Sequence, residues 1–234
     1  MNITKEILEI LKNFSQIKSS INFVAGNVIR TKNEDSSFYA SSEISEKFPI
    51  DFSIYDLSQF IRALSLFDES EIDFKDTHMV IKNKNGIGKI NYTYTNPIMV
   101  SSAVDYTKNP KFKNLVCEFE LSNETFKQLL KAGQVFGIET LIFKAKDQAN
   151  IEVVVANLDN NKKDTDNSFS TQIAIQNASE EVKTLNISTD KNIFKIIPGD
   201  YLVKLYNVND KIYMLEMINK GDTKLTYYAG AKVV

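Results

Sequence analysis

The alternation of short helical and short strand-like segments is the feature that most constrains the fold of this 234-residue chain. Apolar residues recur at helical spacing over residues 3–14 and 57–64, and possible helix caps stand near the start of each stretch, Asn2 or Thr4 and Asp56. Runs rich in β-branched and aromatic residues follow each helix, as in strands. Helices this short are unstable alone in water, so each must pack its apolar stripe on a sheet.

The same order of elements restarts after residues 105–114, a polar segment that contains Pro110 and shows neither period. A strand ends at the helix cap Ser122, a helix follows over residues 124–136, and a second short helix begins near Asp190 after further strands. This internal duplication predicts an α+β fold of two similar domains, each with two helices packed on antiparallel sheets. We place an N-terminal domain at 1–108, a connector at 109–114 and a C-terminal domain at 115–234.

The composition provides little for catalysis or metal binding. The chain has one histidine, His78, and one cysteine, Cys117, which cannot form a zinc site or a Cys-His pair by themselves. The N-terminal sequence has no apolar block of signal-peptide length, and no stretch approaches the length of a membrane span. We therefore expect an intracellular protein that is not an enzyme and that uses no metal, cofactor or membrane.

Basic side chains lie opposite the apolar stripe in all four predicted helices. On a helical wheel they fall roughly 140° to 160° from the centre of the stripe. One amphipathic helix with outward lysines is ordinary, but four of four are harder to attribute to chance. The residues predicted on this basis to form an outward basic surface that faces phosphates are Lys5, Lys12, Arg62, Lys127, Lys131, Lys191 and Lys195.

The charge balance of these helices differs from that of the whole chain, whose formal net charge is −2. With Lys18, the helices carry eight basic residues, and most of their acids stand at caps or in first turns. The pattern predicts one basic surface on an otherwise acidic protein, with contacts to phosphates that do not depend on base sequence. The acidic residues of the helices are Glu6, Glu9, Asp56, Glu124 and Asp190.

Three segments resemble the sliding clamp of T4-like bacteriophages: residues 11–14 (LKNF), 54–67 (IYDLSQFIRALSLF) and 198–205 (PGDYLVKL). The C-terminal LTYYAGAKVV is similar to the closing tail of the eukaryotic and archaeal proliferating-cell nuclear antigen clamps. The resemblance covers essentially the whole chain. It implies the DNA-clamp fold, a head-to-tail homotrimeric ring whose helices surround duplex DNA, and the function of a polymerase processivity factor.

The resemblance also implies partners for the chain. The C-terminal peptide of the replicative DNA polymerase would bind an apolar pocket, an ATP-dependent clamp loader would open the ring, and late-transcription factors would be further partners, all in the cytoplasm of the infected host. AGA replaces the sequence that carries a proline in the nuclear antigen tail. The pocket positions are Pro198, Tyr227, Tyr228, Ala229 and Gly230.

Neighbouring subunits of such rings join by pairing of edge strands, which by order of elements places the contact at Met99–Val104 and Phe169–Ala174. Two other functions stay open at this point. One is a phage structural or assembly protein, and the other is a monomeric clamp-like accessory subunit of the polymerase. The residues predicted to form the subunit interface are Met99, Val100, Val104, Phe169 and Ile173.

Overall fold

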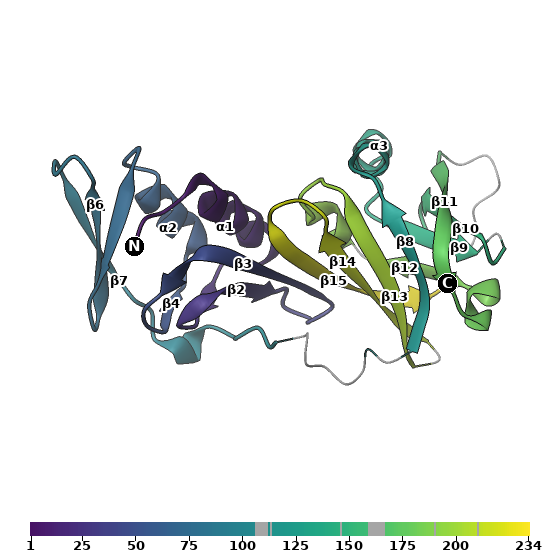
Figure 1. Cartoon of the computed structure of the whole chain (residues 1–234), viewed down its shortest axis with the longest axis horizontal. Helices are drawn as coiled ribbons and strands as arrows, with labels where there is room; N and C mark the ends of the chain where they lie inside the picture. Colours follow the sequence, from purple (N-terminus) through teal and green to yellow (C-terminus); the bar gives the residue numbers. More distant parts are fainter. Residues whose placement is uncertain (106–111, 113, 146, 159–166, 190, 210) are drawn as a thin grey trace. The chain divides into compact units, whose positions relative to one another are not determined.

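The computed structural model describes residues 1–105, 112, 114–145, 147–158, 167–189, 191–209 and 211–234 (Figure 1). The chain forms two compact units, Met1–Asp105 and Tyr106–Val234. Residues 106–111 and 113, which include most of the predicted connector, lie outside the described residues.

The first unit contains two α-helices, α1 and α2, among short strands. In Figure 1 the two helices lie side by side, and α1 also packs on β2 and β3. The elements are α1 (Lys5–Ile17), β1 (Ile21–Phe23), β2 (Gly26–Lys32), β3 (Phe38–Phe48), β4 (Phe52–Ile54), α2 (Leu57–Leu64), β5 (Ser70–Phe74), β6 (His78–Asn83), β7 (Lys89–Thr93) and the 3₁₀ helix η1 (Pro97–Met99).

The second unit contains one longer α-helix and longer strands. Its elements are β8 (Asn114–Leu121), α3 (Asn123–Phe136), β9 (Leu141–Ala145), β10 (Asn150–Val155), β11 (Phe169–Ala178), the 3₁₀ helix η3 (Glu180–Thr184), β12 (Asn186–Thr189), the 3₁₀ helix η4 (Lys191–Lys195), β13 (Tyr201–Asn209), β14 (Ile212–Asn219) and β15 (Lys224–Val233).

The strands of the second unit pair in a closed antiparallel cycle. The order is β8–β13–β14–β15–β12–β9–β10–β11, and β11 pairs again with β8. The β12–β15 contact joins Ile187 to Val233, and the β11–β8 contact begins only at Ile175. Closure satisfies most backbone groups of these strands within the unit, because a closed sheet has few free edges.

The first unit repeats this pairing order in a shorter form. Strands β5, β6 and β7 pair in sequence, β1 pairs with β4, and β2 pairs with β3. Backbone bonds extend the series at both ends: Ile3 N–H donates to Ser70 O (3.1 Å), and Thr95 N–H donates to Ser53 O (2.9 Å). The duplication predicted from the sequence is therefore present as a repeated order of strand pairing.

Each α-helix begins at a side-chain cap that the sequence offers, and of the two candidates Asn2 and Thr4 it is Thr4 that caps α1. Thr4 Oγ1 accepts a hydrogen bond from Ile7 N–H (3.2 Å), Asp56 Oδ1 accepts one from Gln59 N–H, and Ser122 Oγ accepts one from Thr125 N–H. The apolar stripes are buried in the units. The core residues of the helices are Ile7, Ile10, Leu11, Phe14, Leu57, Phe60, Ile61, Leu64, Phe126 and Leu129.

Two predicted elements differ in type. The segment near Asp190, predicted as a helix like the others, is the five-residue 3₁₀ helix η4, and Pro198, which cannot continue a helix, follows three residues after its end. Residues 97–104, predicted as strand, form η1 and an irregular segment. Their side chains alternate too little between buried and exposed to pack as a strand of this unit.

Gly133 allows α3 and η4 to approach closely. A Cβ atom on Gly133 would overlap the ring of Phe194 and would lie 2.8 Å from the carbonyl oxygen of Ile138. The Phe194 ring can move slightly to relieve the overlap. The carbonyl oxygen of Ile138 can move only if the backbone moves, which costs more free energy. The small residue is therefore required by packing and not by its backbone angles.

We predict that Gly133→Ala lowers the free energy of unfolding by about 1–3 kcal/mol, the usual cost of overpacking a core. Urea unfolding followed by circular dichroism at one protein concentration measures it. The matched control is Gln134→Ala, on the exposed neighbouring residue, which should change stability by less than about 0.5 kcal/mol. Equal stability of the glycine variant and the control would contradict the assigned packing.

Candidate DNA-facing surface and partner pocket

Helices α1 and α2 present their basic residues to solvent. Lys5 and Lys12 are both exposed and lie two helical turns apart on the same side of α1, opposite buried Ile7 and Leu11. Arg62 is exposed in the last turn of α2. The geometry of an amphipathic helix packed on its sheet therefore exposes all three charges.

Helix α3 also presents its basic residues to solvent, but η4 exposes only one of its two lysines. Lys127 and Lys131 are exposed and four residues apart, which places them on one side of α3. Lys191 is exposed, whereas Lys195 is half-buried and makes an interaction of its own. A 3₁₀ helix turns about 120° per residue, so Lys191 and Lys195 diverge by about a third of a turn instead of sharing a face.

Lys18 was included among the outward charges of the helices, and the structure corrects this. Its side chain is only 7% exposed, and its ammonium group lies 3.4 Å from a carboxylate oxygen of Glu34. Lys18 follows the last residue of α1, and the chain there is extended and turns its side chain inward. Lys18 therefore does not belong to the basic surface.

Six of the predicted basic residues form no ion pair within the described part of the chain. They differ in this from other surface lysines such as Lys75, Lys84 and Lys220, which lie 2.7–3.2 Å from carboxylates. Unpaired charges in solvent are available for phosphates without first breaking an internal contact. These six are Lys5, Lys12, Arg62, Lys127, Lys131 and Lys191.

Two of the predicted pocket residues are core residues instead. On β15 the side chains alternate, and Tyr227 (0% exposed) and Ala229 point into the unit. The Tyr227 ring meets Tyr201 edge-on, its hydroxyl accepts a hydrogen bond from Ile197 N–H (3.3 Å), and burial raises its pKa. Tyr227 and Ala229 are therefore not available to a partner, because the strand period directs them to the core.

Tyr228 points the other way and joins a cluster that the sequence did not reveal. Its ring stacks on Phe112 with centroids 5.6 Å apart and planes at 5°, and Tyr206 lies 5.6 Å from the same Phe112. The hydroxyls of Tyr228 and Tyr206 donate to the two carboxylate oxygens of Glu216, at 3.1 and 3.0 Å. We call these four residues the aromatic cluster.

The strand register explains why the aromatic cluster forms. Glu216 on β14 stands opposite Tyr228 on β15 and opposite Lys204 on β13, and Tyr206 follows Lys204 by two residues on the same face. Residues from three strands and the connector thus meet, although they are more than 100 positions apart at the extremes. Alternation along each strand was visible in the sequence, but the register between strands was not.

The remaining predicted pocket residues, Gly230 and Pro198, do not lie on the same side of β15. Gly230 is half-buried and lies on the same side of β15 as Tyr228. Pro198 is exposed and follows Ile197, whose amide bonds to the inward-facing Tyr227. The structure therefore groups Gly230 with Tyr228 and places Pro198 beside the opposite face of the strand.

The predicted interface residues lie on two segments, residues 99–104 of the first unit and β11 of the second. Met99 and Val104 are 62% and 60% exposed, but Val100 is 4% exposed and belongs to the core of its unit. Residues 169–174 of β11 pair with β10 on one side, while β8 joins the other side only from Ile175 onward. Phe169 and Ile173 are half-buried on this strand.

Neither Cys117 nor the carboxylates of the described residues suggest a reactive centre. Burial raises the pKa of the Cys117 thiol to about 12, so it stays protonated near neutral pH. Among the residues that the structure describes, no group of three or more His, Cys, Asp or Glu side chains is arranged to hold a metal. In that same part of the chain, no helix is long and apolar enough to cross a membrane.

Comparison with solved structures defines the class of the fold. A. fulgidus PCNA, solved with the C-terminal region of FEN-1 bound, matches with a TM-score of 0.66 at 14% identity, over 100% of this chain and 98% of that one. At this identity the likeness concerns the fold alone. Two units with a repeated strand order and helices on antiparallel sheets are thus the DNA-clamp fold.

Comparison of sequences gives the family. Residues 4–101 match the family described as DNA polymerase processivity factor. The sliding clamp of Vibrio phage KVP40 is 30% identical over 62% of this chain and 66% of its own length. That of Escherichia phage RB69 is 29% identical over 91% of this chain and 90% of its own length.

The chain belongs to the sliding clamps of T4-like phages, which are DNA polymerase processivity factors. This confirms the resemblance found in the sequence and the expected DNA-clamp fold. Proteins of this class are scaffolds and not enzymes. A phage structural or assembly protein is not favoured by these relatives.

The aromatic cluster should make the free energy of unfolding depend on pH in the alkaline range. Burial and the neighbouring Glu216 carboxylate raise the pKa of the Tyr206 phenol above its ordinary value of 10.0. Above pH 10 the unfolded chain loses this proton and the folded chain keeps it, so the stability that Tyr206 contributes falls as pH rises. The advantage of the wild type over Tyr206→Phe in urea unfolding should therefore shrink between pH 8 and pH 11.

The control for this prediction is Tyr55→Phe, since the Tyr55 side chain is 59% exposed. Its loss should change the free energy of unfolding little at either pH, because an exposed hydroxyl keeps its contact with water on folding. An advantage of Tyr206 that stays constant, or grows with pH, would contradict the assigned hydrogen bond.

Proposed function

We propose that this chain is one subunit of a homotrimeric ring that encircles duplex DNA and tethers the replicative polymerase of a phage. The observation that carries the proposal is the set of six exposed basic side chains on α1, α2, α3 and η4 that form no ion pair with a described residue, in a chain with a net charge of −2. Their contacts to phosphates are independent of base sequence and weakened by salt. Lysine predominates, which suits loose point-charge contacts in which DNA slides.

Subunits of the proposed ring join through two segments. One is Phe169–Ala174 on β11, whose outer edge pairs with no described residue, and the other is the segment Met99–Val104 of the neighbouring subunit. A head-to-tail contact between different surfaces closes into a ring when the rotation between subunits allows it. Met99, Val104, Phe169 and Ile173 would supply apolar contacts across this strand pair, and Val100 would support it from the core.

The polymerase tail would bind at the aromatic cluster. An apolar peptide needs a hydrophobic surface with a few polar groups that fix its orientation. Tyr228 is 2% exposed because Phe112 stacks on it, so a peptide side chain would reach Tyr228 by displacing Phe112. Gly230 and Pro198 would border the site. The archaeal relative, solved with a C-terminal region of FEN-1 bound, supports this kind of partner.

The other proposed partners follow from the topology of a closed ring. A separate ATP-dependent clamp loader would open the ring and close it around primed DNA, because a closed ring cannot bind a long duplex from the side. Late-transcription factors would use the same ring as a mobile anchor. The phage origin of the matched relatives supports an activity in the cytoplasm of an infected host cell.

We expect the double variant Lys127→Glu and Lys131→Glu to lower processive synthesis by the cognate polymerase about tenfold or more, since a net change of four charges at the lining repels phosphates. Primer extension on a long single-primed template, with clamp loader present, measures it. The matched control is Lys89→Glu with Lys211→Glu, two exposed lysines outside the helices that change the total charge equally. Equal product lengths for the two double variants would refute the lining assignment.

We also expect the purified protein to have a mass of three times 26.6 kDa at micromolar concentration. Light scattering coupled to gel filtration measures this directly. The closed-ring model requires a trimer, whereas the monomeric accessory subunit remains at the mass of one chain. A single-chain mass at every accessible concentration would rule out the ring.

A further inference from the structure

Phe112 covers the surface that the polymerase tail would need. Its ring stacks on Tyr228 with centroids 5.6 Å apart and planes at 5°, and Tyr206 lies 5.6 Å from the same ring. Tyr228 points away from the core of the unit on β15, yet its side chain is only 2% exposed. A residue of the same chain therefore occupies the place that a partner side chain would take.

The other three residues of the aromatic cluster hold one another without Phe112. The hydroxyls of Tyr206 and Tyr228 donate to separate carboxylate oxygens of Glu216, at 3.0 and 3.1 Å, and the Phe112 side chain contributes no polar group. Loss of the Phe112 ring therefore breaks none of these hydrogen bonds and removes only the stacking contacts. A different aromatic side chain can make the same contacts.

Phe112 is also the member of the aromatic cluster that lies on no strand. Tyr206, Glu216 and Tyr228 lie within β13, β14 and β15, whereas Phe112 is half-buried and stands two residues before β8 begins at Asn114. Because so few residues separate it from the strands of the same unit, its ring stays near the site at a high effective concentration. A partner peptide has to compete with it.

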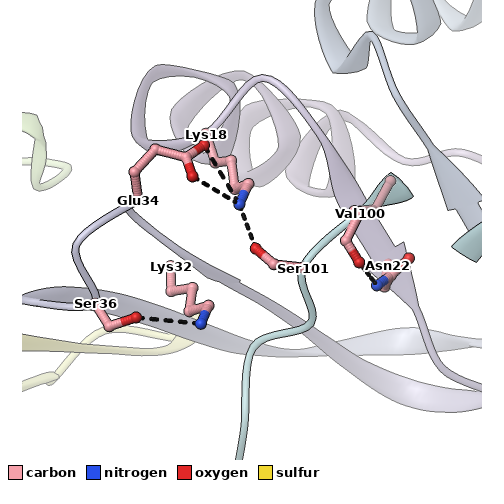
Figure 2. A network of polar contacts seen from close by, with 7 residues as sticks. All are labelled: Lys18, Asn22, Lys32, Glu34, Ser36, Val100 and Ser101. Atoms are coloured by element: carbon pink, nitrogen blue, oxygen red, sulfur yellow. Dashed lines mark hydrogen bonds and ion pairs between the residues drawn. The ribbon is translucent and has the colours of Figure 1, made fainter. Parts of the chain in front are cut away.

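The first unit holds the chain as far as Asp105. Figure 2 shows Lys18 at the end of α1, whose Nζ donates to Ser101 Oγ (2.5 Å), and Asn22, whose Nδ2 donates to the carbonyl oxygen of the residue before Ser101 (2.8 Å). Arg30 on β2 lies 3.3 Å from a carboxylate oxygen of Asp105. The chain is thus held on one side by the first unit and on the other by β8, and Phe112 can leave the cluster without disturbing the core of either unit.

We infer that Phe112 is an internal ligand of the partner site, and that a partner peptide binds by replacing it with an aromatic side chain of its own. The inference rests on the proposed function. Two aromatic contacts favour the docked Phe112 ring by about tenfold. Because a partner binds only the molecules in which the site is vacant, the apparent affinity falls by the same factor. Phe112 thereby sets the affinity of the site for its partners.

Peptide affinity tests the inference. The probe is a synthetic C-terminal peptide of the cognate polymerase, and isothermal titration calorimetry measures its dissociation constant with the full chain. Phe112→Ala should bind the peptide about tenfold more tightly than wild type, because the site no longer has to be vacated. Phe112→Tyr keeps a stacking ring and should bind with nearly the wild-type affinity. Weaker binding by Phe112→Ala would show that the partner uses the Phe112 ring as part of its site, and would overturn the inference.

The control for loss of an aromatic ring is Tyr55→Ala, since the Tyr55 side chain is 59% exposed in the first unit. Its affinity for the peptide should equal that of wild type. If Tyr55→Ala tightened binding as much as Phe112→Ala, the effect would not come from the partner site and the inference would fail. A peptide that binds neither wild type nor Phe112→Ala would refute the proposed partner site, and the inference with it.

Tryptic cleavage gives a second measurement that works on the wild type, so it decides alone if Phe112→Ala fails to fold. Lys111 and Lys113 stand on either side of Phe112, and trypsin must draw the chain around its cleavage point into its own active site. Saturating peptide should therefore speed cleavage after these two lysines about tenfold, since the rate follows the population of the released form. Cleavage after Lys84, in the turn between β6 and β7, is the internal reference and should not change. Slower cleavage beside Phe112 with bound peptide would overturn the inference and leave the partner site standing.

Discussion

Burial of one apolar stripe on each short helix is the constraint on which the rest of this structure depends. Helices of 8 to 14 residues gain too little from their own hydrogen bonds, so packing on a sheet provides most of their stability. Once the stripe is buried, the opposite side of the helix must face solvent. The basic residues of α1, α2 and α3 are therefore exposed as a consequence of the same packing that forms the core.

Strand closure determines which edges remain available to partners. In the second unit the cycle of eight strands satisfies nearly every edge, but β8 meets β11 only from Ile175 onward and leaves residues 169–174 free on one side. In the first unit the N–H groups of residues 102–104 make no hydrogen bond to a described residue, and side chains of Lys18 and Asn22 bind the chain just before them. Free strand edges attract other strands, so such edges among the described residues bear on assembly.

Local patterns predicted much of the fold and part of the site. Caps, apolar spacing and turn residues depend on neighbours within a few positions, so the helices at Thr4, Asp56 and Ser122 and most strands were predictable. The type of a helix and the direction in which a strand's side chains point were harder to predict from the sequence. The segment near Asp190 forms a 3₁₀ helix where the spacing predicted an ordinary helix. Alternation along β15 indicates that Tyr227 and Tyr228 face opposite sides, but it does not indicate which side is the core, and the structure buries Tyr227 in it.

The sequence by itself determined the repeated order of elements, the amphipathic helices with outward charge and the family to which the chain belongs, because all of these are carried by short-range spacing and residue type. Only the tertiary structure decided the contacts between distant residues: the meeting of Phe112, Tyr206 and Tyr228 around Glu216, and the reach of Lys18 to Ser101. The register between strands and the burial of individual side chains arise from packing of the whole unit, and no local pattern encodes them.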